Sequence, residues 1–127
     1  MRLLLDTHTF LWFIYRPPTG ERFYDLCLDT NNDLFLSVAS YWEICIKVSL
    51  GKMKLADDWQ KVFEREMAIN EIHWLPIEPR HCRAVIALPH HHRDPFDRLL
   101  IAQAQTETLT LLSADPNFGG YDVATIW

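Results

Sequence analysis

Four acidic residues stand close to the places where the sequence predicts strands to end or helices to begin. They come from widely separated parts of the chain: Asp6, Glu43, Asp97 and Asp115. Asp6 directly follows a short apolar run, and a carboxylate buried at the end of such a strand is costly unless another group compensates it. If the strands run parallel, the four side chains converge at one edge of the sheet.

Clustered carboxylates suit hard divalent cations. Mg²⁺ and Mn²⁺ prefer oxygen ligands, and an ion held this way activates water and neutralises charge on a phosphoryl group. Without a cation the carboxylates repel one another, which raises some of their pKa values. We expect Asp6 to be a direct ligand, and Asp97 and Asp115 to bind directly or through water. Glu43 is expected to bind the ion or to act as a base that orients the attacking water.

Each acid also has a simpler structural interpretation. Asp94 and Asp115 are each followed by proline, a combination typical of an N-cap and the first helical position. Asp97 would lie in the first turn of a helix and complement its dipole, and Glu43 could be an exposed helix acid. The sequence alone leaves capping and metal binding open for these residues.

Apolar runs alternate with helix-like segments along the chain. The runs that predict strands cover residues 2–5, 34–36, 74–77 and 109–112, with a possible fifth at 123–127. Helices are expected at 7–15, 21–30, 40–50, 58–69, 79–88 and 95–107. Pro17 and Pro18 should stop the first of these helices. The alternation predicts an α/β fold of three layers, a small parallel sheet of four to five strands flanked by helices.

Composition narrows the class of protein. The length of 127 residues fits one domain, 1–127, and an apolar fraction of 49% excludes a disordered chain. With 12 basic and 17 acidic residues, the net charge of −5 excludes a basic clamp for nucleic acids. It does not exclude a nucleic-acid enzyme whose acidic site is filled by metal cations.

The cysteines and apolar runs indicate a soluble cytoplasmic protein. Cys27, Cys45 and Cys82 form an odd, scattered set without a C-x-x-C pair, which argues against disulfides and a zinc knuckle. Asp6 interrupts the apolar start, and no cleavage site follows, so we expect no signal peptide. No apolar run reaches the length of about 18 residues that a membrane span needs.

Four segments resemble PIN-domain ribonucleases and, more narrowly, the VapC-type toxins of toxin–antitoxin pairs. They are L-L-D-T-H at 4–8, S-Y-W-E-I at 40–44, D-P-F-D-R-L-L-I-A at 94–102 and L-S-A-D at 112–115. The third segment is the most specific, and the resemblance spans essentially the whole chain.

This resemblance implies an activity and partners as well as a fold. It implies one or two Mg²⁺ or Mn²⁺ ions, hydrolysis of RNA phosphodiester bonds, inhibition by a cognate antitoxin, and homodimerisation. Asp6, Glu43, Asp97 and Asp115 match the four acids of the family, so none is missing. The positions that would support these acids are occupied by Thr7, Ser37, Asp94 and Ser113.

Basic, aromatic and histidine residues are candidates for substrate contact. The five tryptophans could stack on bases, but their spacing favours the core or a protein interface. The run His90–His92 favours a solvated loop over a zinc site, because three consecutive residues rarely point at one ion. The candidates for phosphate contact, each equally well explained as a solvated charge, are Lys47, Lys52, Lys54, Arg93 and Arg98.

Two alternative functions remain at this stage. One is a non-catalytic module that binds RNA or protein and keeps an acidic pocket for structure. The other is a metal-dependent DNA nuclease with the same acids. The complete set of four acids counts against the first alternative, because a binding module has no need of them all.

Overall fold

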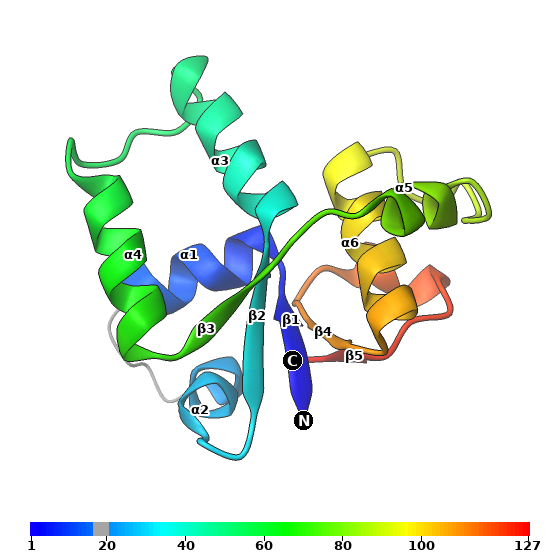
Figure 1. Cartoon of the computed structure of the whole chain (residues 1–127), viewed down its shortest axis with the longest axis horizontal. Coiled ribbons are helices and arrows are strands. Elements are labelled where there is room, and N and C mark those ends of the chain that lie inside the picture. The colour runs from blue at the N-terminus through cyan, green and yellow to red at the C-terminus, as the bar shows by residue number, and fades with distance from the viewer. Residues whose placement is uncertain (17–20) are drawn as a thin grey trace.

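The fold is a five-stranded parallel sheet between two layers of helices, as Figure 1 shows. A computed structural model describes residues 1–16 and 21–127. The strands are β1 (Arg2–Leu5), β2 (Asp33–Ser37), β3 (Ile72–Leu75), β4 (Thr110–Leu112) and β5 (Thr125–Ile126). Their order is β3-β2-β1-β4-β5, and all neighbours pair in parallel. The strand order therefore reverses between β1 and β4, the position at which open α/β sheets bind ligands.

The predicted helices are all found; α1 and α6 have the predicted bounds, and the ends of the other four are shifted. They are α1 (Thr7–Tyr15), α2 (Arg22–Leu28), α3 (Val38–Ser49), α4 (Trp59–Ile69), α5 (Pro79–Val85) and α6 (Pro95–Glu107), and a 3₁₀ turn covers Pro116–Gly120. The prediction of an α/β fold with a parallel sheet is confirmed. Pro17 and Pro18, which were expected to end α1, lie outside the described residues.

The boundaries of α3 and β3 differ from expectation for reasons that the structure shows. The third helix was expected to begin at Ser40, but α3 begins at Val38 because the Ser37 hydroxyl accepts the backbone N–H of Ala39 at 3.0 Å. This contact makes Ser37 the N-cap and starts the helix directly at the end of β2. The third strand was expected at 74–77 and instead runs from Ile72 to Leu75, in register with β2.

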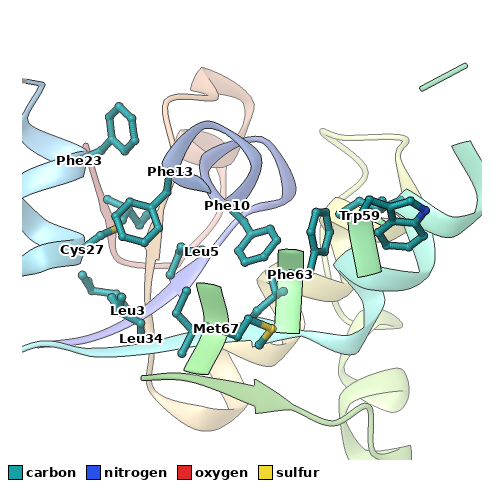
Figure 2. Packing of buried hydrophobic residues seen from close by; sticks show 14 residues of the cluster. Leu3, Leu5, Phe10, Phe13, Phe23, Cys27, Leu34, Trp59, Phe63 and Met67 are labelled. Atoms are coloured by element: carbon teal, nitrogen blue, oxygen red, sulfur yellow. The ribbon is translucent and has the colours of Figure 1, made fainter. Parts of the chain in front are cut away.

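Successive leucines of β1 face opposite helical layers. Leu3 and Leu5 pack in one cluster with Phe10 of α1, shown in Figure 2, whereas Leu4 packs in a second cluster with Ile101 of α6. All three leucines are fully buried, and each contributes about 1.5–3 kcal/mol on burial. A shift of β1 by one residue would turn each of its side chains to the opposite face of the sheet, so this packing fixes the register of β1. The next residue, Asp6, then lies at the edge of the sheet that is formed by the carboxyl ends of the strands.

The N-termini of three helices lie at that edge. In Figure 1, α1, α3 and α6 all begin at the end of the sheet where β1 and β2 finish. Their N-caps are Asp6, Ser37 and Asp94, and each side chain accepts a backbone N–H of its helix. The partial positive charge of three helix dipoles is therefore directed toward this edge.

Candidate active site

Asp6 ends β1 and caps α1. Its side chain is only 5% exposed, and one carboxylate oxygen accepts the backbone N–H of Thr9 at 2.7 Å. The other oxygen accepts the hydroxyl of Ser113, which follows the neighbouring strand β4. Among the described residues no lysine or arginine forms an ion pair with Asp6. Its buried carboxylate is stabilised by these hydrogen bonds and by the partial positive charge at the N-terminus of α1.

Glu43 reaches the same edge from α3. It is 5% exposed; one oxygen accepts the Thr7 hydroxyl at 2.7 Å, and the other lies 3.0 Å from Nζ of Lys47. Because α3 starts early, Glu43 lies in its second turn. Thr7 therefore contacts one of the four acids, and its role in orienting that acid stays a prediction. Lys47, a candidate phosphate contact, is instead ion-paired with that acid.

Two further acids come from the start of α6. Asp94 is the N-cap and accepts the backbone N–H of Asp97 at 3.3 Å. The pKa of Asp97 is raised to about 7, first by burial and then by the negative charges of Asp94, Glu43 and Asp6, while His92 lowers it. Asp97 is thus close enough to three other carboxylates for each to oppose its ionisation.

Asp115 joins this group through a histidine. One of its oxygens accepts the backbone N–H of Asn117 at 2.9 Å, so it caps the 3₁₀ turn. Its other oxygen lies 3.7 Å from Nε2 of His92, which is 3.0 Å from Oδ2 of Asp97. Asp94 and Asp115 therefore act as caps and also lie near the other acids, and the two interpretations of these residues do not exclude each other.

His92 is the residue that the sequence analysis missed. His90 and His91 are exposed, as a solvated loop predicts, but the side chain of His92 is only 14% exposed and turns toward the acids. Its Nδ1 accepts the backbone N–H of Asp94 at 3.2 Å. The one sequence signal that could have indicated its role was its position two residues before the N-cap Asp94. The turn that starts α6 also directs the side chain of His92 toward the acids.

Arg98 lies in the interior and does not face a substrate. It is 8% exposed, and its guanidinium donates to the carbonyl of Pro89 at 2.7 Å and to those of Val85 and Leu88 at 3.3 and 3.4 Å. Its interpretation as a phosphate contact is therefore wrong. Arg98 satisfies the carbonyls of the segment that leads from α5 toward α6.

Other predicted residues lie apart from the acids. The Ser37 hydroxyl donates to Oε1 of Gln103 at 2.5 Å, so it joins β2 to α6 and has no hydrogen bond to any of the acids. Lys52, Lys54 and Arg93 are exposed, and their contact with phosphate remains a prediction.

The tryptophans divide between core and surface. Trp59 is buried as expected, but Trp42 is 57% and Trp74 46% exposed, so the core interpretation is wrong for these two. Trp42 packs edge-on against Phe96, with 5.4 Å between ring centroids. These two rings directly adjoin Glu43 and Asp97 in sequence and place an apolar surface next to the acids.

A hollow of about 300 Å³ opens beside the acids. The exposed ring of His8 packs near Trp12, with 6.2 Å between the ring centroids. The hollow leaves room for a ligand next to two of the carboxylates. Its lining consists of Asp6, His8, Trp12, Ala114, Asp115 and Pro116.

The donor set fits a hard divalent cation. The four acids offer only oxygen atoms as ligands. Within residues 1–16 and 21–127, only one of them forms an ion pair with a lysine or arginine, which is Glu43 with Lys47. The pKa of Asp97 is raised mainly by burial and also by the neighbouring carboxylates, and a bound cation would offset both effects. Oxygen ligands of this kind favour Mg²⁺ or Mn²⁺ over metals that prefer sulfur or nitrogen.

Comparison with known proteins identifies the family and the fold. Residues 3–123 match the family model of the PIN domain. A search of curated proteins found no match. Among solved structures, VapBC2 from Rickettsia felis bound to a DNA fragment from its promoter is similar over 99% of this chain and 98% of its own, with 16% identity and a TM-score of 0.78.

Two further structures share the fold. DNA-bound VapBC from Salmonella typhimurium matches over 99% of this chain and 97% of its own, with 15% identity and a TM-score of 0.71. FitAcB from Neisseria gonorrhoeae matches over 98% and 96%, with 20% identity and a TM-score of 0.67. At these identities the likeness concerns the fold, and the family model covers nearly the whole sequence; the chain belongs to the PIN-domain family.

Proposed function

We propose that this protein is a Mg²⁺- or Mn²⁺-dependent endoribonuclease and the toxin of a toxin–antitoxin pair, formed by one PIN domain over 1–127. The observation that carries the proposal is the environment of Asp97. Burial and three neighbouring carboxylates raise its pKa to about 7, and no lysine or arginine of the described residues pairs with it. Such a site gains stability from a cation, and phosphate can then approach it.

Asp6, Asp97 and Asp115 would hold the ion, which supplies an activated water and neutralises charge on the phosphoryl group. The contacts of Thr7 and Lys47 fix both oxygens of Glu43, which is then placed to orient the attacking water or accept its proton. The N-termini of α1, α3 and α6 add partial positive charge where the phosphate must lie.

Partners are the second part of the proposal. Several structures that share the fold are toxin–antitoxin complexes, which supports an antitoxin for this chain. We expect the antitoxin to insert a basic side chain among the acids. A homodimer is supported by exposed apolar residues on α3 and at its C-cap, namely Val38, Trp42 and Leu50.

The proposed compartment is the cytoplasm, where the RNA substrate is found. All three cysteines are free, which fits a reducing environment. In the described part of the chain, no helix combines the length and the apolar character needed to cross a bilayer.

The test is Asp6→Asn, which keeps the shape of the side chain and one acceptor oxygen for the cap of α1 and removes the charge. We expect the wild-type protein to cleave single-stranded RNA with Mg²⁺ or Mn²⁺ and to arrest growth when expressed in bacteria. Asp6→Asn should lower cleavage by at least about 100-fold and abolish the arrest. Asp33→Asn, an exposed acid at the start of β2, is the matched control and should behave as wild type.

Circular dichroism should show that both variants are folded. Equal cleavage by Asp6→Asn and wild type would contradict the metal site. Cleavage of single-stranded DNA in preference to RNA would identify the protein as a DNA nuclease. RNA binding without cleavage in the presence of any divalent ion would favour a non-catalytic binding module.

A further inference from the structure

We propose that His92 is a positioning residue of the metal site, whose Nε2–H holds one oxygen of Asp97 while the other oxygen remains available to the ion. The inference rests on the proposed function, because it assumes that Asp97 binds a cation. It assigns a role to a side chain of the loop between α5 and α6, a segment visible in Figure 1.

The first observation is the tautomer of His92. Its Nδ1 accepts the backbone N–H of Asp94 at 3.2 Å, so Nδ1 carries a lone pair and the ring proton lies on Nε2. Nε2 is therefore a donor. A metal ligand needs a lone pair at that atom, so the same contact with Asp94 excludes His92 as a ligand through Nε2.

The second observation is where that donor lies. Nε2 is fully buried, 3.0 Å from Oδ2 of Asp97 and 3.7 Å from Oδ2 of Asp115, yet neither contact has the geometry of a hydrogen bond. A buried donor without a partner is unfavourable. A small turn of the Asp97 carboxylate would complete the bond, and binding of an ion at its other oxygen favours such an ordered orientation.

The third observation is that the backbone of His92 is held in place by hydrogen bonds. The backbone N–H of His92 donates to the Tyr121 hydroxyl at 2.7 Å, and Nη1 of Arg98 lies 3.4 Å from the same hydroxyl. Arg98 also holds the carbonyls of the preceding segment. His92 is therefore part of a supported framework, which is what an acid needs when its orientation determines the strength of metal binding.

The experiment measures Mn²⁺ binding by titration calorimetry with the full chain, without substrate. His92→Ala should weaken Mn²⁺ binding by about 10- to 100-fold, the range typical of groups that orient metal ligands. His92→Gln, whose amide supplies an N–H at nearly the same distance from the backbone, should recover most of the affinity. His90→Ala, an exposed neighbour in the same loop, is the control and should bind as wild type.

Ni²⁺ separates positioning from direct ligation, because imidazole ligands favour Ni²⁺ far more than Mn²⁺. We expect His92→Ala to weaken the binding of both ions to a similar extent. A loss confined to Ni²⁺ would make His92 a ligand and overturn the proposal. Unchanged or tighter Mn²⁺ binding by His92→Ala would overturn it as well, as would failure of His92→Gln to rescue.

Asp97→Asn distinguishes this inference from the proposed function. If wild type binds Mn²⁺, Asp97→Asn does not, and His92→Ala matches wild type, only the role of His92 is lost. If the wild-type protein itself binds neither Mn²⁺ nor Mg²⁺, the metal-dependent function fails and the inference fails with it.

Discussion

Two clusters in this molecule place a histidine between carboxylates in the same way. In the candidate active site, His92 lies near Asp97 and Asp115; between α5 and α6, His81 lies near Glu78 and Glu107. Nδ1 of His81 accepts the backbone N–H of Glu78 at 3.0 Å, and its Nε2 lies 2.8 Å from Glu107. Both rings therefore carry their proton on Nε2 and direct it toward an acid.

The clusters differ in the cation that accompanies the acids. Arg80 donates to Glu78 at 2.8 Å and also donates to Glu107. The hydrogen bond and charge of Arg80 lower the pKa of Glu78, whereas burial and neighbouring acids raise the pKa of Asp97. A group of carboxylates and a histidine is thus not in itself a metal site. The cluster that already contains its cation is a structural network, and the one that lacks it is the candidate for an external ion.

The same substitution in the two clusters should lower the free energy of unfolding by very different amounts. His81 is fully buried and makes both ring contacts, so His81→Ala should lower the free energy of unfolding by about 2–4 kcal/mol. His92→Ala should cost only about 1 kcal/mol in metal-free protein, because it removes the hydrogen bond at Nδ1 alone and Nε2 has none to lose. Urea unfolding in EDTA measures both values.

Mn²⁺ binding completes this comparison. His81→Ala should bind the ion as wild type at a temperature where the variant is folded. A large loss of Mn²⁺ affinity in His81→Ala, with little change in stability, would reverse the roles assigned to the two clusters.

The pH dependence of stability should separate Asp97 from ordinary acids. Its pKa is about 7 in the folded protein against 3.8 for an unperturbed aspartate, so the folded state binds the proton more tightly. The contribution of Asp97 to the free energy of unfolding therefore falls as the pH rises from about 4 to 7. The fall is about 1–2 kcal/mol once solvent screening is allowed for. Urea unfolding at pH 5 and pH 8 in EDTA should show this fall in wild type.

The matched variants sharpen that result. Asp97→Asn should lack this component of the pH dependence, whereas Asp33→Asn should keep it. Saturating Mn²⁺ at pH 8 should raise the stability of wild type but not of Asp97→Asn. An identical pH dependence in wild type and Asp97→Asn would show that Asp97 is not the group that titrates.

Lys47 offers the smallest effect. It contacts Glu43 from one helical turn away and is about one third exposed, so the ion pair is weak. Lys47→Met should lower the free energy of unfolding by about 0.5 kcal/mol or less in thermal or urea unfolding. A loss above about 2 kcal/mol would mean that Lys47 is the main counter-charge of the site, and the contrast with Arg80 would no longer hold.

Much of the fold could be predicted because its signals are local. The apolar runs and helix periodicity gave the strand and helix order, and the parallel arrangement placed Asp6 at the edge of the sheet. The start of α3 was less predictable, because it depended on whether Ser37 or a later residue supplied the cap. The caps at Asp94 and Asp115 were readable from the prolines that follow them.

The site was predictable in its acids and less so in their surroundings. Arg98 and His92 lie six residues apart, and local sequence made the first a phosphate contact and the second a solvated loop residue. Whether a side chain turns inward depends on partners distant in the chain, such as Tyr121, which contacts both. Trp42 and Trp74 show the same limit, because their exposure depends on how helices and strands from other segments cover them.

The sequence by itself determined the order of strands and helices and the chemistry of an acidic site, because periodicity and residue type act over short distances. Only the tertiary structure decided which charges remain uncompensated. Arg80 reaches Glu78 and Glu107, whereas within the described residues no arginine pairs with Asp97. Electrostatic interactions depend on separation in space and on burial, and those are set only when β1, α3, α5 and α6 are packed together.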